Sequence, residues 1–312
     1  MPSENRVVWI DLLKFFGLLF VILGHINSPA SQFIYSWHMP LFFFISGFFV
    51  RNPSSFGDVV TFIKKDFNRL MVPYFFFSVV GLFAEVVKRK ILGRDSVDIF
   101  QSLIGIFYKM NIDGLSDHYG FILWFLSALF FAKLFLYFIL LIIKNNSLSA
   151  LVLSTLLFFS SFYFISPFSL NIACNALFWL SLGYLLSRLD ESVDFYNFVL
   201  LASLFFLITI FSLSGRIPSL DMARNYYELQ SLNVIWALGV IAFLVSGSKL
   251  LSSHFNFKFL KIISKYFLLI FIFHPYSNNV AYLIVMKYFD GQWFYVTIQH
   301  PAKDDSGNSS WL

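Results

Sequence analysis

The chain has 312 residues, of which 58% are hydrophobic and only 12% are charged. A soluble domain carries about 25% charged residues, so this composition excludes an ordinary soluble enzyme and predicts a protein that crosses the membrane many times. The single cysteine, Cys174, excludes an intrachain disulfide and a cysteine metal cluster, and a net charge of +5 in so apolar a chain does not point to nucleic acid.

Long apolar runs decide which kind of membrane fold to expect. Runs of about 20 apolar residues predict helices, whereas a barrel would show shorter alternating segments. We therefore expect an all-α fold, a polytopic transmembrane helical bundle. The nine expected spans are Val7–Ile26, Phe33–Val50, Leu70–Val87, Gly120–Ile143, Leu148–Ile165, Ile172–Leu189, Phe195–Leu213, Leu232–Leu250 and Ile262–Met286. The last contains His274 and Pro275, and since proline removes a backbone donor we expect it to bend there.

The first expected span carries three ionisable residues, Asp11, Lys14 and His25. At about 100° per residue they fall on one side of the helix, and Lys14 and His25 lie roughly 16 Å apart along its axis. Charges inside a membrane are costly and are functional by default. The alternative is structural: Asp11 and Lys14 form an ion pair that makes the span tolerable, and His25 is an interfacial helix end.

Basic residues predict the orientation, because they gather on the cytoplasmic side of membrane proteins. A cytoplasmic N-terminus places most of them in inner connections, and only the loop that holds Lys88-Arg89-Lys90 disagrees. Within that loop, Ser96–Met110 has the apolar spacing of an amphipathic helix on the membrane surface. We expect one membrane domain over residues 1–298 and a polar, disordered tail over residues 299–312.

Six short motifs follow one another in the chain. They are Asp11-x2-Lys14-x10-His25, His38-Met39-Pro40-Leu41-Phe42-Phe43-Phe44-Ile45-Ser46-Gly47, Arg69-Leu70-Met71-Val72-Pro73-Tyr74, Leu123-Trp124-Phe125-Leu126, Leu182-Gly183-Tyr184-Leu185 and Ser264-x9-His274. In this order the motifs resemble the acyltransferase-3 family of integral membrane acyltransferases, and most of all its fucose 4-O-acetylase-type subgroup. The family has about ten helices, so the resemblance implies nine to ten here. The segment that begins at Trp293 starts like a final span, but a polar tail cuts it off.

The resemblance implies an enzyme of a bacterial plasma (inner) membrane, an O-acyltransferase and foremost an O-acetyltransferase. Its donor would be a cytoplasmic acyl-CoA such as acetyl-CoA, with no metal. Its acceptor would be a hydroxyl of a cell-surface or lipid-linked glycan, and its surroundings membrane lipids. The rival hypothesis is a transporter or flippase for a lipid-linked sugar or a small metabolite. An inverted repeat would favour the rival, and the sequence contains none that we can detect.

The resemblance also assigns roles to particular residues. His25 would be the catalytic base, because an imidazole accepts protons near neutral pH, and Asp11 would belong to the catalytic group. The predicted donor-binding residues are Lys14, Arg69 and Lys65, whose cations suit phosphates and amides. Lys64 and Lys65 would also satisfy the positive-inside rule without any ligand.

Three further residues are predicted to line the acceptor site: His38, Trp124 and His274. Each has a structural alternative. His38 could cap a helix, Trp124 could be ordinary packing, and His274 could mark a kink. Ser46 and Gly47 fit close helix packing better than a nucleophile.

Overall fold

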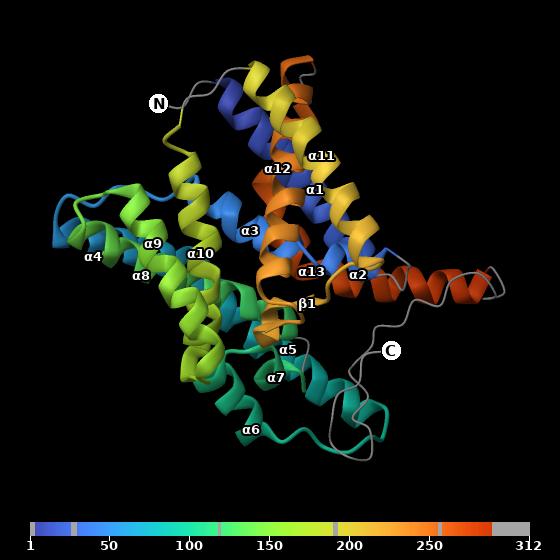
Figure 1. Ribbon diagram of the computed structural model, residues 1–312. Coiled ribbons are helices and arrows are strands. Elements are labelled where there is room, and N and C mark those ends of the chain that lie inside the picture. Colours follow the sequence, from blue (N-terminus) through green and yellow to red (C-terminus); the bar gives the residue numbers. More distant parts are fainter. Residues whose placement is uncertain (1–3, 26–29, 118–119, 190–192, 255–257, 289–312) are drawn as a thin grey trace.

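The computed structural model describes residues 4–25, 30–117, 120–189, 193–254 and 258–288, and most of them are helical (Figure 1). This confirms the expected all-α class. Five helical stretches in the described part are long and apolar enough to cross a membrane: Phe56–Ile91, Phe121–Ile142, Pro167–Leu186, Phe195–Ser214 and Ser231–Ser252. A helical membrane bundle is therefore supported, and the count of nine to ten helices stays a prediction. The expected tail, residues 299–312, lies outside the described residues.

The elements follow in a simple order. The first part consists of α1 (Glu4–Gly24), α2 (Ser31–Tyr35), α3 (His38–Gly47), α4 (Phe56–Asp66), a π-helical turn (Phe67–Met71) and α5 (Val72–Ile91). The second part consists of α6 (Ile99–Ile104), a π-helical turn (Gly105–Lys109), α7 (Ile112–Leu115), α8 (Trp124–Ile142), α9 (Ser147–Ser160), α10 (Leu170–Leu186), α11 (Val193–Ser214), β1 (Leu220–Asp221), β2 (Tyr226–Tyr227), α12 (Ser231–His254) and α13 (Lys258–Tyr288). The expected helix in Ser96–Met110 is confirmed by α6 and the turn behind it.

The expected span Phe33–Val50 is wrong as a single helix, because the chain breaks between α2 and α3. Trp37 leaves helical geometry with φ −150° and ψ −19°. The Ser36 hydroxyl donates back to the Phe33 carbonyl at 2.6 Å and closes α2. Pro40 then falls in the first turn of α3, where a missing backbone N–H is harmless.

The prediction that a helix begins at Leu70, after an inner loop, is also wrong. The structure has one continuous helical stretch there, made of α4, the π-helical turn and α5. Its start at Phe56 is fixed by a capping box. The Ser55 hydroxyl accepts from the Asp58 backbone N–H at 3.2 Å, and the Asp58 carboxylate accepts from the Ser55 N–H at 3.0 Å. Lys65 and Arg69 are therefore helical residues, not loop residues.

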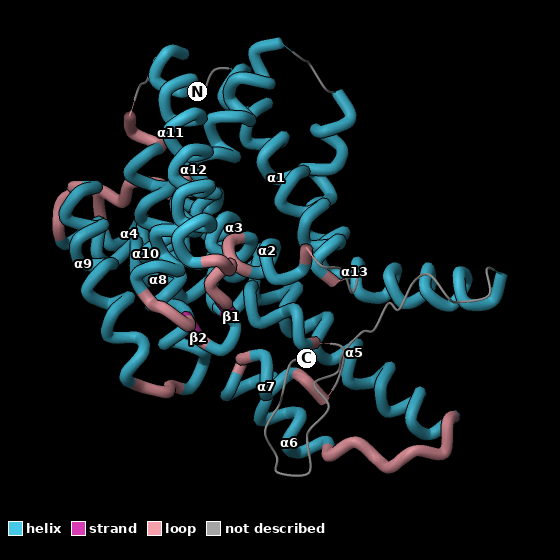
Figure 2. The backbone as a smooth tube through the Cα atoms, turned by 45° about the vertical axis from the view of Figure 1, so that its right-hand side comes forward, coloured by secondary structure: helices cyan, strands magenta, loops and turns pink. Residues whose placement is uncertain are grey.

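The bend expected in the last span is confirmed. Pro275 lies inside the 31-residue α13. Figures 1 and 2 show two arms, one beside α1 and one that turns away from the bundle. The first arm of α13 is therefore a partner of the helix that carries Asp11, Lys14 and His25.

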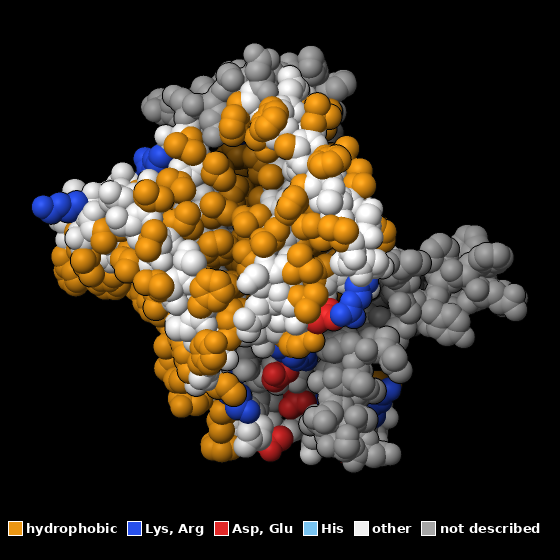
Figure 3. Space-filling model, viewed as in Figure 1, with side chains coloured by type: hydrophobic (Ala, Val, Ile, Leu, Met, Phe, Trp, Pro, Cys, Tyr) orange, Lys and Arg blue, Asp and Glu red, His pale blue; other side chains and the backbone are white. Residues whose placement is uncertain are grey.

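A small hairpin, β1 and β2, connects α11 to α12. The hydroxyl of Tyr227 in β2 donates to Asn175 of α10 at 2.8 Å, and burial raises the pKa of Tyr227, so the hydroxyl keeps its proton. Arg224, between the strands, pairs with Asp221 at 2.9 Å and with Asp113 at 3.1 Å. Figure 3 shows apolar side chains over most of this face and charged side chains gathered near the hairpin.

Two glycines let α3 and α10 touch backbone to backbone. A Cβ built on Gly183 would lie 1.9 Å from the Phe44 carbonyl oxygen, and one on Gly47 would lie 2.1 Å from the Leu180 carbonyl oxygen. No side chain fits at either distance without moving a helix. The packing interpretation of Gly47 is confirmed, and Ser46 donates to the Phe42 carbonyl at 2.8 Å as a helix residue does.

This contact gives a stability prediction. Gly183→Ala should destabilise the protein by about 1–3 kcal/mol, the usual cost of overpacking, visible as a lower thermal unfolding midpoint in detergent. The control is Gly247→Ala in α12, where a Cβ would meet only Leu200 at 3.7 Å. Alanine favours a helix over glycine by about 1 kcal/mol, so the control should be neutral or stabilising. Equal midpoints for the two variants would contradict the close contact.

Candidate active site

The parallel packing of α1 on the first arm of α13 pairs two sets of polar side chains. Between the middle of α1 and the first turns of α13, Lys14 Nζ donates to Ser264 Oγ at 3.4 Å. Farther along, the rings of His25 and His274 lie 4.9 Å apart. The two contacts are eleven residues apart on α1 and ten on α13, or about 15 Å along the axes. The site therefore has a cationic end and an imidazole end.

The imidazole end holds three histidines and one tyrosine: Tyr35 contacts His25 and His38, and His25 contacts His274. The Tyr35 ring lies 5.9 Å from His25 and 5.3 Å from His38, and the Tyr35 hydroxyl is 3.4 Å from His25 Nδ1. His38 and His274 are buried, and His25 is partly exposed. The structure thus brings together three residues that the sequence predicted for the site. It adds Tyr35, which the sequence analysis missed because it lies in no motif.

Backbone carbonyls fix how His38 and His274 carry their protons. His38 Nδ1 lies 2.9 Å from the Ile34 carbonyl oxygen, and His274 Nδ1 lies 2.6 Å from that of Phe271. A carbonyl only accepts, so in each neutral ring Nδ1 holds the proton and Nε2 offers a lone pair. The Nε2 atom of His274 is buried and has no hydrogen-bond partner among the described residues.

Pro275 explains why the Phe271 carbonyl is available to His274. In a regular helix the N–H of residue 275 would donate to the carbonyl of residue 271, four positions earlier. Proline has no N–H, so the carbonyl is left for the imidazole at 2.6 Å. The kink and the orientation of His274 are therefore one feature, and the structural and functional interpretations of this motif do not compete.

An aromatic layer lies between the two ends of the site. Phe42 is 5.3 Å from Phe267 and 6.1 Å from Phe271, Phe125 is 5.4 Å from Phe271, and Phe271 is 5.7 Å from His274. These separations are those of ordinary aromatic packing. The layer keeps the cationic end and the imidazole end apart by apolar material.

The cationic end is built around Lys14. Its ammonium lies 4.6 Å from the centre of the Phe49 ring. No ion pair within 4.0 Å joins Asp11 and Lys14 in the described part of the chain. Asp11 is buried and lies about 21 Å from His25 along the helix, so the structure places it at the cationic end.

Arg69 and Lys65 lie on the helical stretch that follows α3. Both are exposed. Arg69 lies on the π-helical turn that follows α4, and its role at the donor phosphates stays a prediction. Among the described residues, no side-chain hydrogen bond or ion pair links Lys65 to Lys14 or Arg69.

A buried ion pair beside Arg69 is the main feature that sequence reasoning missed. Lys133 Nζ lies 2.8 Å from Asp66 Oδ1, and the Tyr137 hydroxyl donates to Asp66 Oδ2 at 2.8 Å. Lys133 interrupts an expected span, just as Lys14 does. That was the available signal, because a lysine in an apolar run needs a partner.

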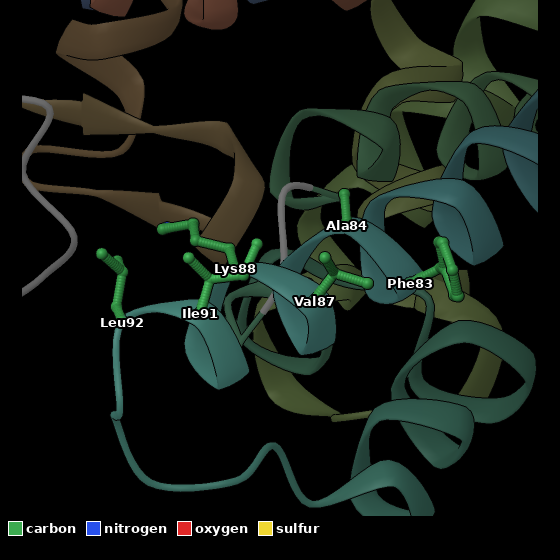
Figure 4. Close-up of a pocket in the computed structure, with 6 residues that line it drawn as sticks. All are labelled: Phe83, Ala84, Val87, Lys88, Ile91 and Leu92. Atoms are coloured by element: carbon green, nitrogen blue, oxygen red, sulfur yellow. The ribbon is translucent and has the colours of Figure 1, made fainter.

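Trp124 is the one predicted acceptor residue that the structure places elsewhere. It is buried at the start of α8 and packs on Phe43 and Phe125, with ring centres 6.4 Å from each. Among the described ring contacts, none joins Trp124 to His25, His38 or His274, which fits the packing interpretation. An open apolar hollow of 450 Å³ lies on α5 between Phe83 and Leu92, also apart from the histidines (Figure 4).

Within the described residues, no group of three or more His, Cys, Asp or Glu side chains is arranged to hold a metal ion.

Comparison with known proteins gives one match that spans almost the whole chain. The acyltransferase-3 family model, described as an acyltransferase domain, matches residues 7–302. No curated protein and no solved structure matches the chain. The matched region contains α1, α13 and every site residue described above. The chain belongs to the acyltransferase-3 family and is a membrane acyltransferase.

Proposed function

We propose that this protein is an O-acetyltransferase that carries an acyl group from cytoplasmic acetyl-CoA, or another acyl-CoA, to a hydroxyl of a cell-surface or lipid-linked glycan. Its place would be the plasma membrane of a bacterium, with the N-terminus in the cytoplasm. The observation that carries the proposal is the pairing of α1 with α13, which puts Lys14 beside Ser264 at one end and the imidazoles of His25 and His274 together at the other. A fucose 4-O-acetylase-type acceptor remains the narrower prediction.

The cationic end suits the donor. Coenzyme A carries phosphates, which bind Lys and Arg through charge-assisted hydrogen bonds. Lys14 is the cation that α1 brings to this end, and we assign Arg69 and Lys65, one helical turn apart, to the same phosphates. The separation of about 15 Å between the ends is comparable to an extended pantetheine arm, so phosphates held near Lys14 leave the thioester within reach of the histidines. Asp11 would orient Lys14 in this arrangement.

The imidazole end suits the acceptor. His25 would take the proton of the acceptor hydroxyl while its oxygen attacks the thioester carbonyl carbon. The carbon–sulfur bond then breaks, and the coenzyme A thiolate takes the proton from His25. The Nε2 lone pairs of His38 and His274 can accept hydrogen bonds from further hydroxyl groups of the sugar.

Removal of the base tests this assignment. His25→Ala should lower acetyl transfer by a factor of about 10²–10⁴, the usual contribution of a general base. The measurement is mass spectrometry of surface glycan from cells with equal amounts of each variant in the membrane. Leu23→Ala is the control, because it shortens a side chain of the same helix that is 39% exposed, and it should keep full acetylation. Undiminished acetylation in His25→Ala would refute the role of His25.

The donor end makes a second prediction. Lys14→Gln should raise KM for acetyl-CoA about tenfold, the loss of one hydrogen bond to a charged group, and Lys14→Arg should restore it. Lys265→Gln, an exposed residue next to Ser264, is the control and should leave KM unchanged. Purified protein that binds no acetyl-CoA and turns over no thioester would favour the transporter hypothesis instead.

The kink makes a third prediction. Pro275→Ala supplies a backbone N–H that competes with His274 for the Phe271 carbonyl. Once its proton is no longer fixed on Nδ1, His274 presents the acceptor with the wrong tautomer part of the time. We expect kcat to fall about tenfold, within the range that acid–base positioning contributes, with KM for acetyl-CoA unchanged. A kcat equal to that of the wild type would show that the tautomer of His274 has no role in transfer.

A further inference from the structure

We infer that Asp66, Lys133 and Tyr137 form a clamp that fixes the π-helical turn Phe67–Met71 and thereby aims Arg69 at the phosphates of the donor. The inference rests on the proposed function, since it assumes that Arg69 binds the donor. It assigns Asp66, Lys133 and Tyr137 as positioning residues that do not themselves touch the donor.

The clamp uses both oxygens of one carboxylate. Lys133 takes Oδ1 and Tyr137 takes Oδ2 of Asp66, each at 2.8 Å. Asp66 and Lys133 are each only 7% exposed. A buried carboxylate with two strong donors has little freedom, because any rotation leaves a charge unpaired in an apolar place.

The position of Asp66 explains how the clamp can affect Arg69. Asp66 is the last residue of α4, and Arg69 lies in the middle of the π-helical turn. One extra residue in a helical turn rotates the rest of the helix by about 100°, and such turns are frequent at functional sites. If Asp66 were released, the turn would be free to relax to a regular helix, and Arg69 would then point in a different direction.

One face of α8 contacts the last residue of α4 and the first residue of the π-helical turn. Lys133 and Tyr137 are one turn apart on α8, and Phe130, one turn earlier on the same face, packs its ring 5.9 Å from that of Phe67. Phe67 is the first residue of the π-helical turn. The turn is therefore attached to α8 by an ion pair, a hydrogen bond and an aromatic contact.

The two cations near the π-helical turn, Lys133 and Arg69, differ in whether their charge is paired. The Lys133 ammonium is already paired with Asp66 and buried, so it is not available to a ligand. The Arg69 guanidinium is exposed, and it has no hydrogen bond or ion pair with any described residue. Arg69 is thus the free cation on a turn whose neighbouring lysine, Lys133, is neutralised.

The test compares two acyl donors on the full-length protein. Acetyl-CoA carries the nucleotide phosphates, and acetyl-pantetheine has the same thioester and arm without them. Tyr137→Phe removes one hydrogen bond of the clamp and keeps the ring. The double variant Asp66→Leu with Lys133→Met removes the ion pair without leaving a buried charge. Arg69→Gln is the reference, and Tyr227→Phe, which removes a buried 2.8 Å tyrosine hydrogen bond elsewhere, is the control.

We expect Tyr137→Phe, the double variant and Arg69→Gln to raise KM for acetyl-CoA about tenfold, the equivalent of one hydrogen bond to a charged group. Their kinetics with acetyl-pantetheine should equal those of the wild type and of Tyr227→Phe. An equal loss with both donors, or no change with either, would overturn the inference. A double variant that fails to fold leaves the decision to Tyr137→Phe. Wild-type protein that transfers from neither donor would refute the proposed function, a result distinct from a failed clamp.

Discussion

Every ionisable group inside this apolar bundle needs a polar or charged partner, and this requirement determines how the helices of the site are arranged. A polar group without compensation in an apolar medium costs several kcal/mol. Lys133 is compensated by Asp66 and Tyr137, and the imidazoles of His38 and His274 are compensated by backbone carbonyls. Lys14 has one long hydrogen bond and one aromatic ring. Lys14 is therefore less fully compensated than Lys133, and the proposed phosphates would supply what it lacks.

Helix breaks supply the carbonyls for the histidines. His274 uses the carbonyl that Pro275 leaves without a helix partner, and His38 uses that of Ile34 across the break at Trp37. A histidine in an unbroken helix would find its neighbouring carbonyls occupied by the ladder. The breaks in α2–α3 and in α13 therefore both fix the imidazole tautomers and set where the rings lie, which is how irregular backbone becomes useful inside a membrane.

The features of this site that could be predicted from the sequence are those that local helix geometry determines. The common face of Lys14 and His25, the bend at Pro275 and the packing role of Gly47 follow from helical period, a missing N–H and a missing side chain. The break at Trp37 was not foreseen, because an apolar run gives no sign of where a hydroxyl such as that of Ser36 will close a helix. The continuous helix from Phe56 was missed although Ser55 and Asp58 have capping-box spacing. The Asp66–Lys133 pair joins residues 67 positions apart, and no local pattern reveals which partner a buried lysine will meet.

The aromatic layer adds a constraint that bears on the proposed chemistry. Water competes with a sugar hydroxyl for any activated thioester, and it would win by concentration in an open cleft. Phe42, Phe125, Phe267 and Phe271 pack between the cationic and imidazole ends at ring separations of 5.3–6.2 Å. These apolar rings offer no hydrogen-bond partner to water. A thioester that moves past these rings would leave water behind and would meet a nucleophile only beside His25, so exclusion of water by the same helices that position the reacting groups would favour transfer over hydrolysis.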